Sequence, residues 1–330
     1  MDKDKLCEKL TEHLEVIKKC SIQTEQGTVL LATVMESRYP YVYPRDSSSA
    51  SMLFRQMVEK GLDSNDNAFN LLKGTAKFIA FVQEDSGKWG QRYGLNGQNK
   101  AIYIQEDNTA YGAIILANYL LACYSRQEEP DELEVYLTRI KKAIQYALKH
   151  FYREEIFLFF STTGIHESAI EKGYSIWVNH VYILFFNLIL QLTDKFNLKG
   201  LFDEELSFKC RFCQAVHRRF ILNDRFVRRI TKDGAFDLRP DVTLMSPVYF
   251  QCKEGHCDSC VLDENPDIIN NSVNFMVENL WDSELGMLQR YLPFTEDIET
   301  HIHAGNGPWI QYTAMLAQYY YQTGAVERGD

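Results

Sequence analysis

The stretch PDELEVYLTRIKKAIQYALKH, residues 130–150, shows the pattern that decides the fold. Its apolar side chains stand three or four positions apart, at Leu133, Leu137, Ile140, Ile144 and Leu148. An α-helix turns once about every 3.6 residues, so this spacing places all of these side chains on one face of a helix. The stretch therefore predicts a helix that starts near Pro130 and buries one apolar face.

The same spacing recurs along most of the chain. Leu6, Leu10, Leu14 and Ile17 form the apolar face of a first helix. A second such face, in residues 68–79, follows a polar cluster at 63–65 that is typical of a helix N-cap. Further helices are expected at about 47–60, 107–124, 173–195, 202–223, 266–280 and 307–322, with a shorter one at 241–250. About ten helices result, with one convincing strand at Ile156–Ser161, so the sequence predicts an all-α fold.

Composition excludes several classes of protein. Hydrophobic residues make up 45% of the 330 residues and charged residues 24%, which excludes disordered chains, collagen-like chains and coiled-coil rods. There are 45 acidic against 35 basic residues, a net charge of −10, so a nucleic-acid partner is not expected. No shift in composition marks a domain boundary. The sequence therefore predicts a single domain over residues 1–330.

The N-terminal twenty residues are charged throughout and lack the apolar core of a signal peptide. The most apolar stretch, Val181–Leu192, is shorter than the roughly 20 residues that a membrane span needs. No membrane association is therefore expected, and the location is predicted to be cytoplasmic. In that compartment the 8 cysteines are expected to be free thiols.

Several long loops carry unusual residues. One ends in Arg45 and Asp46. Taken alone, this pair favours a structural interpretation, with Asp46 as a helix N-cap and Arg45 as an ordinary surface cation. A glycine-rich loop contains Trp89, a position that does not look like a core position and favours a ligand platform. A third loop holds one carboxylate, Glu167, just before an aromatic-rich helix. Long structured loops in a compact domain are commonly functional.

The order of these segments resembles the glucoamylase family of glycoside hydrolases, family 15. The matching motifs spread from Tyr39 to Trp309 and are, in chain order, Tyr-x-x-x-Arg-Asp at 41–46, Trp-Gly-Gln-Arg at 89–92, Gln-x-Asp at 105–107, the Glu167 loop, Tyr-Ser-x-Trp at 174–177, Gly-x-x-x-Arg-Tyr at 286–291 and Gly-Asn-Gly-Pro-Trp at 305–309. Each motif alone is weak, and their shared order carries the resemblance.

The resemblance implies a fold and a set of site residues. The fold is an all-α (α/α)6 barrel of the six-hairpin glycosidase type, of which this chain would supply about ten of the twelve helices. Glu167 resembles the general acid of the family. The residues that resemble its sugar-binding positions are Arg45, Asp46, Trp89, Arg290 and Trp309, with Arg92, Gln105 and Asp107 as further candidates. For Arg92 and Asp107, a salt bridge that orders the loop is an equal alternative. Trp89 and Trp309 are expected to line one cavity with Arg45 and Asp46.

The implied chemistry is hydrolysis, with inversion, of a terminal α-linked glucose in α-glucans or small α-glucosides. One protonated carboxyl group donates to the leaving oxygen and one carboxylate activates water, with the two about 6.5–9.5 Å apart in inverting enzymes. The apolar neighbours Ile165 and Ile170 are expected to raise the pKa of Glu167. No cofactor is expected.

Two departures from the family pattern stand out. His166 and Ser168 flank Glu167 where the family often has Trp and an acidic residue. The general base of the family lies beyond its tenth helix, and nothing after Trp309 resembles its motif; Glu327, in the polar tail, is a poor candidate. Either the chain is truncated or it naturally lacks the last two helices. In both cases the face formed by Leu6, Leu10, Leu14 and Ile17 is expected to lose its cover, so that copies associate or the chain is marginally stable.

Two other functions stay open. The first is a non-catalytic, glucoamylase-like sugar-binding or regulatory domain, of the kind present in the phosphorylase kinase α subunit. The second is a helical scaffold without a sugar site. For the paired cysteines Cys210, Cys213, Cys257 and Cys260, a structural zinc site is weighed against buried free thiols, and the thiols are favoured.

Overall fold

The structure is a computed structural model of the chain, and it describes residues 3–63, 65–166, 170–250, 265, 267–292 and 307–329. The chain divides into two compact units. The first contains residues 1–104, 108–150 and 188–206, and the second contains residues 105–107, 151–187 and 207–330. The prediction of a single domain over 1–330 stays a prediction.

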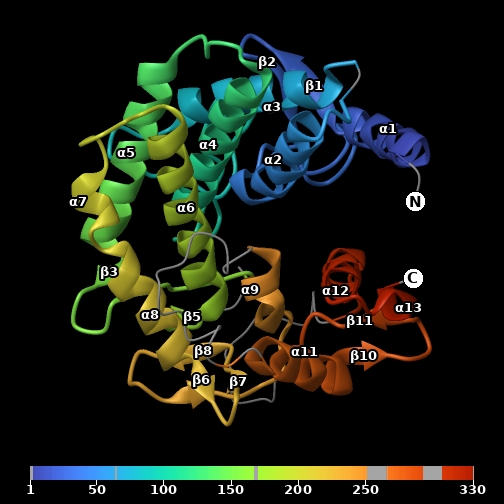
Figure 1. The fold of residues 1–330 in the computed structure, drawn as a ribbon, viewed down its shortest axis with the longest axis vertical. Coiled ribbons are helices and arrows are strands. Elements are labelled where there is room, and N and C mark those ends of the chain that lie inside the picture. The colour runs from blue at the N-terminus through green and yellow to red at the C-terminus, as the bar shows by residue number, and fades with distance from the viewer. Residues whose placement is uncertain are drawn as a thin grey trace. The chain divides into compact units, whose positions relative to one another are not determined.

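The first unit is a set of packed helices with one small hairpin (Figure 1). Its elements are α1 (Lys3–Lys19), β1 (Ser21–Thr24), β2 (Gly27–Leu30), α2 (Pro44–Glu59), α3 (Asn67–Val82), α4 (Asn108–Arg126), α5 (Leu133–His150) and α7 (Asp203–Leu206). Helix α4 packs against α2, α3 and α5, and α3 also packs against β2. Of the face predicted for α1, Leu14 is buried, whereas Leu10 and Ile17 are partly exposed, and the side chain of Leu6 lies outside the described part.

Local sequence explains where two of these helices begin. Helix α2 begins at Pro44, whose fixed φ suits the first helical position, and Tyr43 is its N-cap. The prediction that Asp46 caps this helix is therefore wrong; Asp46 lies in the first turn, where its negative charge opposes the helix dipole favourably. Before α3, the Asp63 carboxylate accepts hydrogen bonds from the backbone N–H groups of Ala68 and Phe69, at 3.1 and 2.8 Å. The N-cap residue itself is Asp66, which makes no side-chain capping bond, so the predicted cluster contributes to the helix start only through the Asp63 carboxylate.

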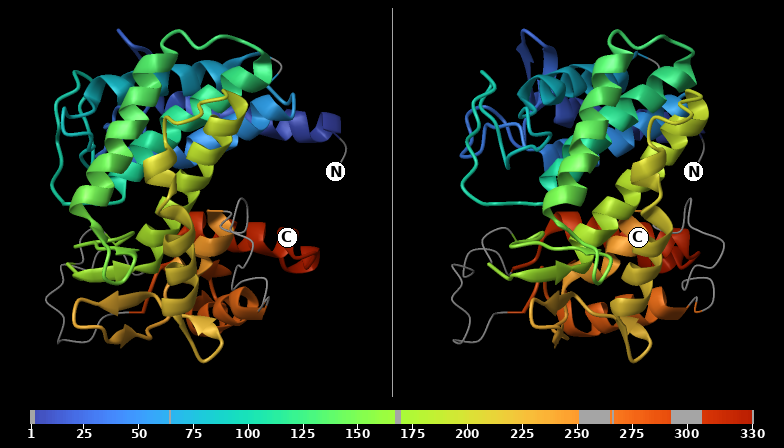
Figure 2. Two further views of the ribbon diagram at one scale, coloured as in Figure 1. Left: turned by 60° about the vertical axis from the view of Figure 1, so that its left-hand side comes forward. Right: turned by 90° about the vertical axis from the view of Figure 1, so that its left-hand side faces the viewer.

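The second unit combines helices with short antiparallel strands. Its elements are β3 (Tyr152–Arg153), β4 (Leu158–Phe159), β5 (Gly173–Ser175), α8 (Lys209–Arg219), β6 (Ile221–Leu222), β7 (Arg225–Phe226), β8 (Arg229–Thr231), β9 (Phe236–Asp237), the 3₁₀-helix η1 (Val242–Met245), α9 (Ser246–Tyr249), α11 (Asp267–Leu280), β10 (Trp281–Asp282), β11 (Met287–Leu288), α12 (Ile310–Gln322) and α13 (Val326–Gly329). Helix α11 packs against β7 and η1, and α12 packs against α9 and β11 (Figure 1, Figure 2).

The short strands correct the sequence prediction in several places. The helix expected at 202–223 is two helices, α7 and α8, because residues 221–226 form a hairpin. Its turn, Asn223-Asp224, has positive φ at both positions, which suits the tight turns of β-hairpins. The stretch 241–250 is a 3₁₀ turn followed by one α-helical turn. Within the strand expected at 156–161, Leu158–Phe159 pairs with β3, and Ser161 makes a single bridge to Gly173. Strands of two to four residues are too short to give a clear periodic signal.

One described helix, α6 (Ile176–Lys195), is long and apolar enough to cross a membrane by length and composition. However, 83% of its apolar window is buried inside the structure, as in a core helix of a folded domain. Residues 176–187 of α6 belong to the second unit and residues 188–195 to the first.

Candidate functional site

Three of the candidate sugar-binding residues, Arg45, Asp46 and Arg92, lie near the start of α2 in the first unit. The Arg45 guanidinium lies 5.8 Å from the ring centre of Tyr111. Arg92 donates hydrogen bonds to the Tyr43 hydroxyl and to the Lys100 carbonyl, both at 2.9 Å, and its guanidinium covers the Tyr41 ring. Arg92 therefore orders its own loop, and both its direct sugar contact and its salt bridge with Asp107 stay predictions.

Trp89 lies in the core of the first unit, which corrects the prediction that its position is unsuited to the core. The indole is 2% exposed and donates its N–H to the Ile79 carbonyl at 2.8 Å. Its ring lies against the α carbon of Gly112, where an added Cβ would stand 2.3 Å from the indole. The glycine that makes room for Trp89 is 23 positions away in the sequence, so no local pattern shows this packing. The proposed sugar contact of Trp89 stays a prediction, and its burial does not favour it.

The remaining candidates belong to the second unit, around the loop that carries Glu167. Glu167 itself, with Ser168 and Ala169, lies outside the described residues. The two ends of the loop are paired, since Ser161 and Gly173 form antiparallel backbone hydrogen bonds. Gly173 has φ +149° and lies so close to β8 that a Cβ would stand 2.3 Å from the Ile230 carbonyl oxygen, so the pairing requires glycine there.

Residues 105–107 adjoin the first part of this loop. The Glu106 carboxylate accepts a hydrogen bond from the Thr162 N–H at 2.9 Å, and the Glu106 carbonyl accepts one from the Tyr182 hydroxyl at 2.9 Å. Gln105 and Asp107 are buried on either side of it. Glu106, which the sequence analysis did not select, therefore joins this segment to the Glu167 loop, while sugar contact by Gln105 and Asp107 stays a prediction.

Arg290 and Trp309 lie together in the second unit. The Arg290 guanidinium is 4.8 Å from the Trp309 ring centre, and Nη2 of Arg290 donates to the Ile165 carbonyl. The helix expected at 307–322 is observed as α12, with Trp309 as its N-cap residue. Arg290 thus contacts both Trp309 and the backbone two residues before Glu167.

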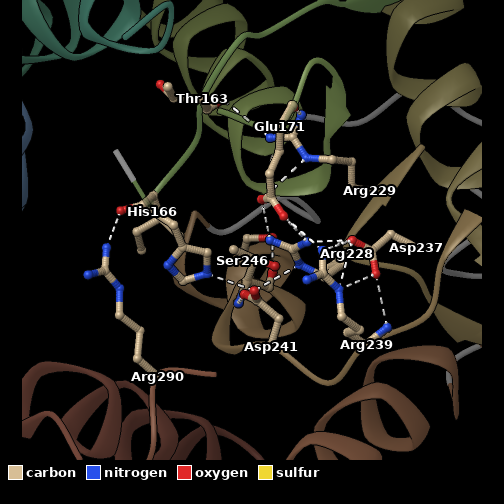
Figure 3. Close-up of polar contacts among 12 residues, drawn as sticks. Thr163, His166, Glu171, Arg228, Arg229, Asp237, Arg239, Asp241, Ser246 and Arg290 are labelled. Atoms are coloured by element: carbon tan, nitrogen blue, oxygen red, sulfur yellow. Dashed lines mark hydrogen bonds and ion pairs between the residues drawn. The ribbon is translucent and has the colours of Figure 1, made fainter. Parts of the chain in front are cut away.

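A buried network of charged side chains lies next to this contact (Figure 3). His166 Nε2 is 2.7 Å from Asp241 Oδ2, and the same oxygen accepts a hydrogen bond from Arg228 Nε at 2.9 Å. Arg228 also donates Nη1 and Nη2 to the two oxygens of Glu171, at 2.9 and 2.6 Å. Further contacts in the network are made by Asp237, Arg239 and Arg229. The side chains of His166, Arg228, Asp241 and Glu171 are 9% exposed or less.

The three-stranded sheet β5-β8-β9 brings these residues together. Arg229 in β8 pairs with both Ser175 in β5 and Asp237 in β9. The side chains of Glu171, just before β5, and of Asp237, at the end of β9, both accept hydrogen bonds from Arg228, which stands just before β8. Asp241, four residues after β9, is the N-cap residue of η1, and its Oδ1 accepts a hydrogen bond from the Thr243 N–H at 2.8 Å.

The charge states in this network follow from burial and pairing. Burial raises the pKa of Glu171 and of Asp237, but Arg228 and the neighbouring guanidinium groups outweigh it, and both pKa values are about 2. The pKa of Asp241 also lies well below 3.8, because its hydrogen bonds and the Arg228 charge outweigh burial. Burial lowers the pKa of His166 below 6.5. His166 is therefore neutral at pH 7, and because Asp241 only accepts, the proton of His166 is on Nε2.

None of these network residues carried a recognisable signal in the sequence. Arg228, Asp237 and Asp241 are single charges in loops or at strand ends, and Arg228 reaches Glu171 across 57 positions. Because Glu171, Asp237 and Asp241 are each held by an arginine, none of the three has the free carboxylate that a general base requires. None of the three is therefore suited to the role of a general base.

The cysteines depart from the prediction at one position. Cys210 is disulfide-bonded, whereas Cys20, Cys123 and Cys213 are free thiols. The expectation that all cysteines are thiols is therefore wrong for Cys210, which also removes it as a thiolate zinc ligand. Cys257 and Cys260 lie outside the described residues. Within the described ranges no cluster of three or more His, Cys, Asp or Glu side chains is arranged to hold a metal ion.

No family model matches the chain, and no curated protein matches it in sequence. Solved structures do match. A glucoamylase from Saccharomycopsis fibuligera has a TM-score of 0.71 at 13% identity, over 98% of this chain and 73% of that one. A glycosidase variant in complex with glucose has a TM-score of 0.66 at 14% identity, over 100% and 83%. A metal-independent α-mannosidase from Streptococcus pneumoniae has a TM-score of 0.64 at 12% identity, over 96% and 83%.

The chain has the glucoamylase-like, six-hairpin fold of these glycosidases. The all-α fold class and the resemblance stated from the sequence motifs are thereby confirmed. At such low identity the likeness establishes the fold alone. The activity, the sugar and the roles of individual residues need their own support.

Proposed function

We propose that this protein is a glycoside hydrolase of the glucoamylase type, which removes terminal α-linked glucose with inversion and uses Glu167 as the general acid. The observation that carries the proposal is the contact of Arg290 with both Trp309 and the Ile165 carbonyl. It joins two side chains suited to holding a sugar to the segment of the candidate proton donor, within a glycosidase fold. A guanidinium donates to sugar hydroxyls, and an indole offers an apolar face to the ring.

The experiment measures release of glucose from maltose, isomaltose and α-glucans, with α-1,6-mannobiose included because one related fold belongs to an α-mannosidase. Proton NMR during the first minutes identifies the anomer of the released sugar. Inversion at an α-linkage gives the β anomer first. The α anomer would contradict an inverting mechanism.

The Glu167→Gln variant tests the general acid. An amide keeps the shape of the carboxyl group but has no proton to give, so hydrolysis should fall by about 10²–10⁴-fold while sugar binding is retained. Glu155→Gln is the control, since Glu155 is an exposed carboxylate in the turn between β3 and β4. It should leave the rate unchanged. A Glu167→Gln enzyme as fast as the wild type would show that another group donates the proton.

A second function, sugar binding without hydrolysis, is favoured by one observation. The buried carboxylates Glu171, Asp237 and Asp241 are all held by arginines, which leaves the general base unassigned. Isothermal titration with maltose separates the two functions. Binding without any glucose release from the wild type would favour a regulatory, glucoamylase-like sugar-binding domain. We propose a cytoplasmic location, which the disulfide at Cys210 does not support.

A further inference from the structure

The residues on both sides of Glu167 are bound to a single guanidinium. After Glu167, the Glu171 carboxylate receives Nη1 and Nη2 of Arg228 at 2.9 and 2.6 Å. Before Glu167, His166 contacts Asp241 at 2.7 Å, and the same Asp241 oxygen receives Nε of Arg228 at 2.9 Å. Figure 3 shows Arg228 between the two carboxylates, with His166 on the far side of Asp241.

We propose that Arg228 is a positioning residue that fixes both flanks of Glu167, directly through Glu171 and indirectly through Asp241 and His166. This proposal rests on the proposed function of Glu167 as general acid. A proton donor acts only within hydrogen-bond reach of the leaving oxygen, so its backbone has to be held to a fraction of an ångström. If only one of the two flanks were fixed, the position of the Glu167 carboxyl group would be less well defined.

Two further contacts strengthen the two flanks. The Ile165 carbonyl accepts a hydrogen bond from Arg290, and the Glu171 carbonyl accepts one from Arg229. The Glu171 N–H also donates to the Thr162 carbonyl at 2.9 Å. These bonds hold the chain at residues 165–166 and again at 171, so the segment between them spans two fixed points.

Two features indicate that the network serves geometry more than stability. A buried ion network is not generally more stable than apolar side chains of the same volume, so its presence favours a role in fixing positions. In addition, Nδ1 of His166 is buried and has no hydrogen-bond partner among the described residues, although Nε2 is bonded to Asp241. An unsatisfied buried acceptor costs free energy, and such costs concentrate at functional sites.

Hydrogen exchange of the purified full chain tests the proposal with three variants. Arg228→Lys keeps the charge but replaces the planar fork with a single ammonium, which cannot reach both carboxylates. Asp241→Asn should free only the flank that contains His166. The amide nitrogen of asparagine is a donor and cannot accept the hydrogen bonds that His166 and Arg228 make to Asp241. Glu171→Gln should release the other side alone. Asp237→Asn is the matched control, since it removes a buried carboxylate from the same arginine without touching either flank.

The expected pattern is specific to each variant. Arg228→Lys raises the exchange rate of both flanks, residues 160–166 and residues 170–175, by about tenfold or more. Asp241→Asn raises the exchange rate of residues 160–166 only, and Glu171→Gln raises that of residues 170–175 only. The hairpin β1–β2 in the first unit reports any general loosening and stays unchanged. The proposal is overturned if Arg228→Lys leaves either flank as protected as in the wild type, or if Asp237→Asn loosens both flanks equally. If Arg228→Lys does not fold, the two single-side variants still decide, because both must open their own flank.

Kinetics supply a readout that a purely structural role would not move. Arg228→Lys should lower kcat by about 10²-fold, the effect of a roughly 1 Å misplacement, while KM for the sugar changes less than about threefold. Asp237→Asn should lower kcat by less than about threefold. A change in KM alone would contradict positioning of the donor. If the wild type releases no glucose, the proposed function fails, and the exchange pattern still decides whether Arg228 fixes both flanks.

Discussion

The two units differ in the kind of side chain they bury. In the first unit, helices α3 and α5 bury the apolar side chains of Leu72, Phe78 and Ile140 completely. The second unit buries charged side chains in addition to apolar ones, among them Arg228 and Asp241. Helix α4 is buried along nearly its whole length and acts as the centre on which α2, α3 and α5 pack. In the second unit, short strands bring together guanidinium and carboxylate groups drawn from residues 171–241. The candidate general acid belongs to the unit with the buried charges.

The difference shows where each kind of interaction is useful. Apolar side chains attract one another without regard to direction, so a helical core tolerates small shifts of its members. Charged hydrogen bonds require particular distances and angles, and a buried charge that loses its partner is costly. A network of such bonds therefore fixes a segment in one place, at the risk of a large loss when one member is removed.

The largest expected effect comes from removing the central cation of the second unit. Arg228→Met would leave Glu171, Asp237 and Asp241 close together without their shared guanidinium, and should lower the free energy of unfolding of this unit by about 3–5 kcal/mol. Urea unfolding followed by hydrogen exchange of β5, β8 and β9 measures the loss. Arg239→Met is the control, because this side chain is 38% exposed and its ion pairs should contribute about 0–1 kcal/mol. Equal losses in the two variants would contradict the central role of Arg228.

Acid should destabilise the second unit more than the first, by a smaller free energy than the loss of Arg228. Glu171 and Asp237 have pKa values of about 2, below the ordinary values of 4.5 and 3.8 for these side chains. Their contribution to stability is therefore complete above about pH 5 and is lost as the pH falls toward 2. Each carboxylate should account for about 2–3.5 kcal/mol. The lowered pKa of His166 acts in the same direction, since the unfolded chain binds a proton below about pH 6.5 and the folded chain does not.

Exchange at pH 7, 5 and 3 measures this prediction. The sheet β5-β8-β9 should lose protection on acidification before α4 and α5 do, because the helices pack mainly through apolar side chains. Parallel loss of protection in both units would show that the buried network is not the acid-sensitive part of the molecule.

The smallest expected effect tests the packing of Trp89 in the first unit. In an exposed helix Gly→Ala stabilises by roughly 1 kcal/mol, but a Cβ at Gly112 would stand 2.3 Å from the indole. Gly112→Ala should therefore destabilise by about 1–3 kcal/mol, measured by thermal unfolding. Gly307→Ala is the control, because nothing lies within 4 Å of its added Cβ. A stabilised Gly112→Ala variant would mean that the indole moves freely, as expected for a wall of an open sugar pocket and not for a core side chain.

Much of the helical fold could be predicted from the sequence. The expected helix at 266–280 is observed at Asp267–Leu280, and the expected helix at 107–124 is observed at Asn108–Arg126. The motif order led to the glycosidase fold, which the solved structures confirm. The cavity shared by Trp89, Trp309, Arg45 and Asp46 stays a prediction.

The sequence by itself determined the helices and the fold, because apolar periodicity and short motifs are local and repeat many times. Only the tertiary structure decided that Trp89 fills a space left by Gly112, and that Arg228 holds Glu171 and Asp241 around the Glu167 loop. Such contacts join single residues far apart in the chain. A lone charge or a lone glycine has no pattern around it, and its partner is fixed only when two-residue strands and a turn bring distant segments to the same place.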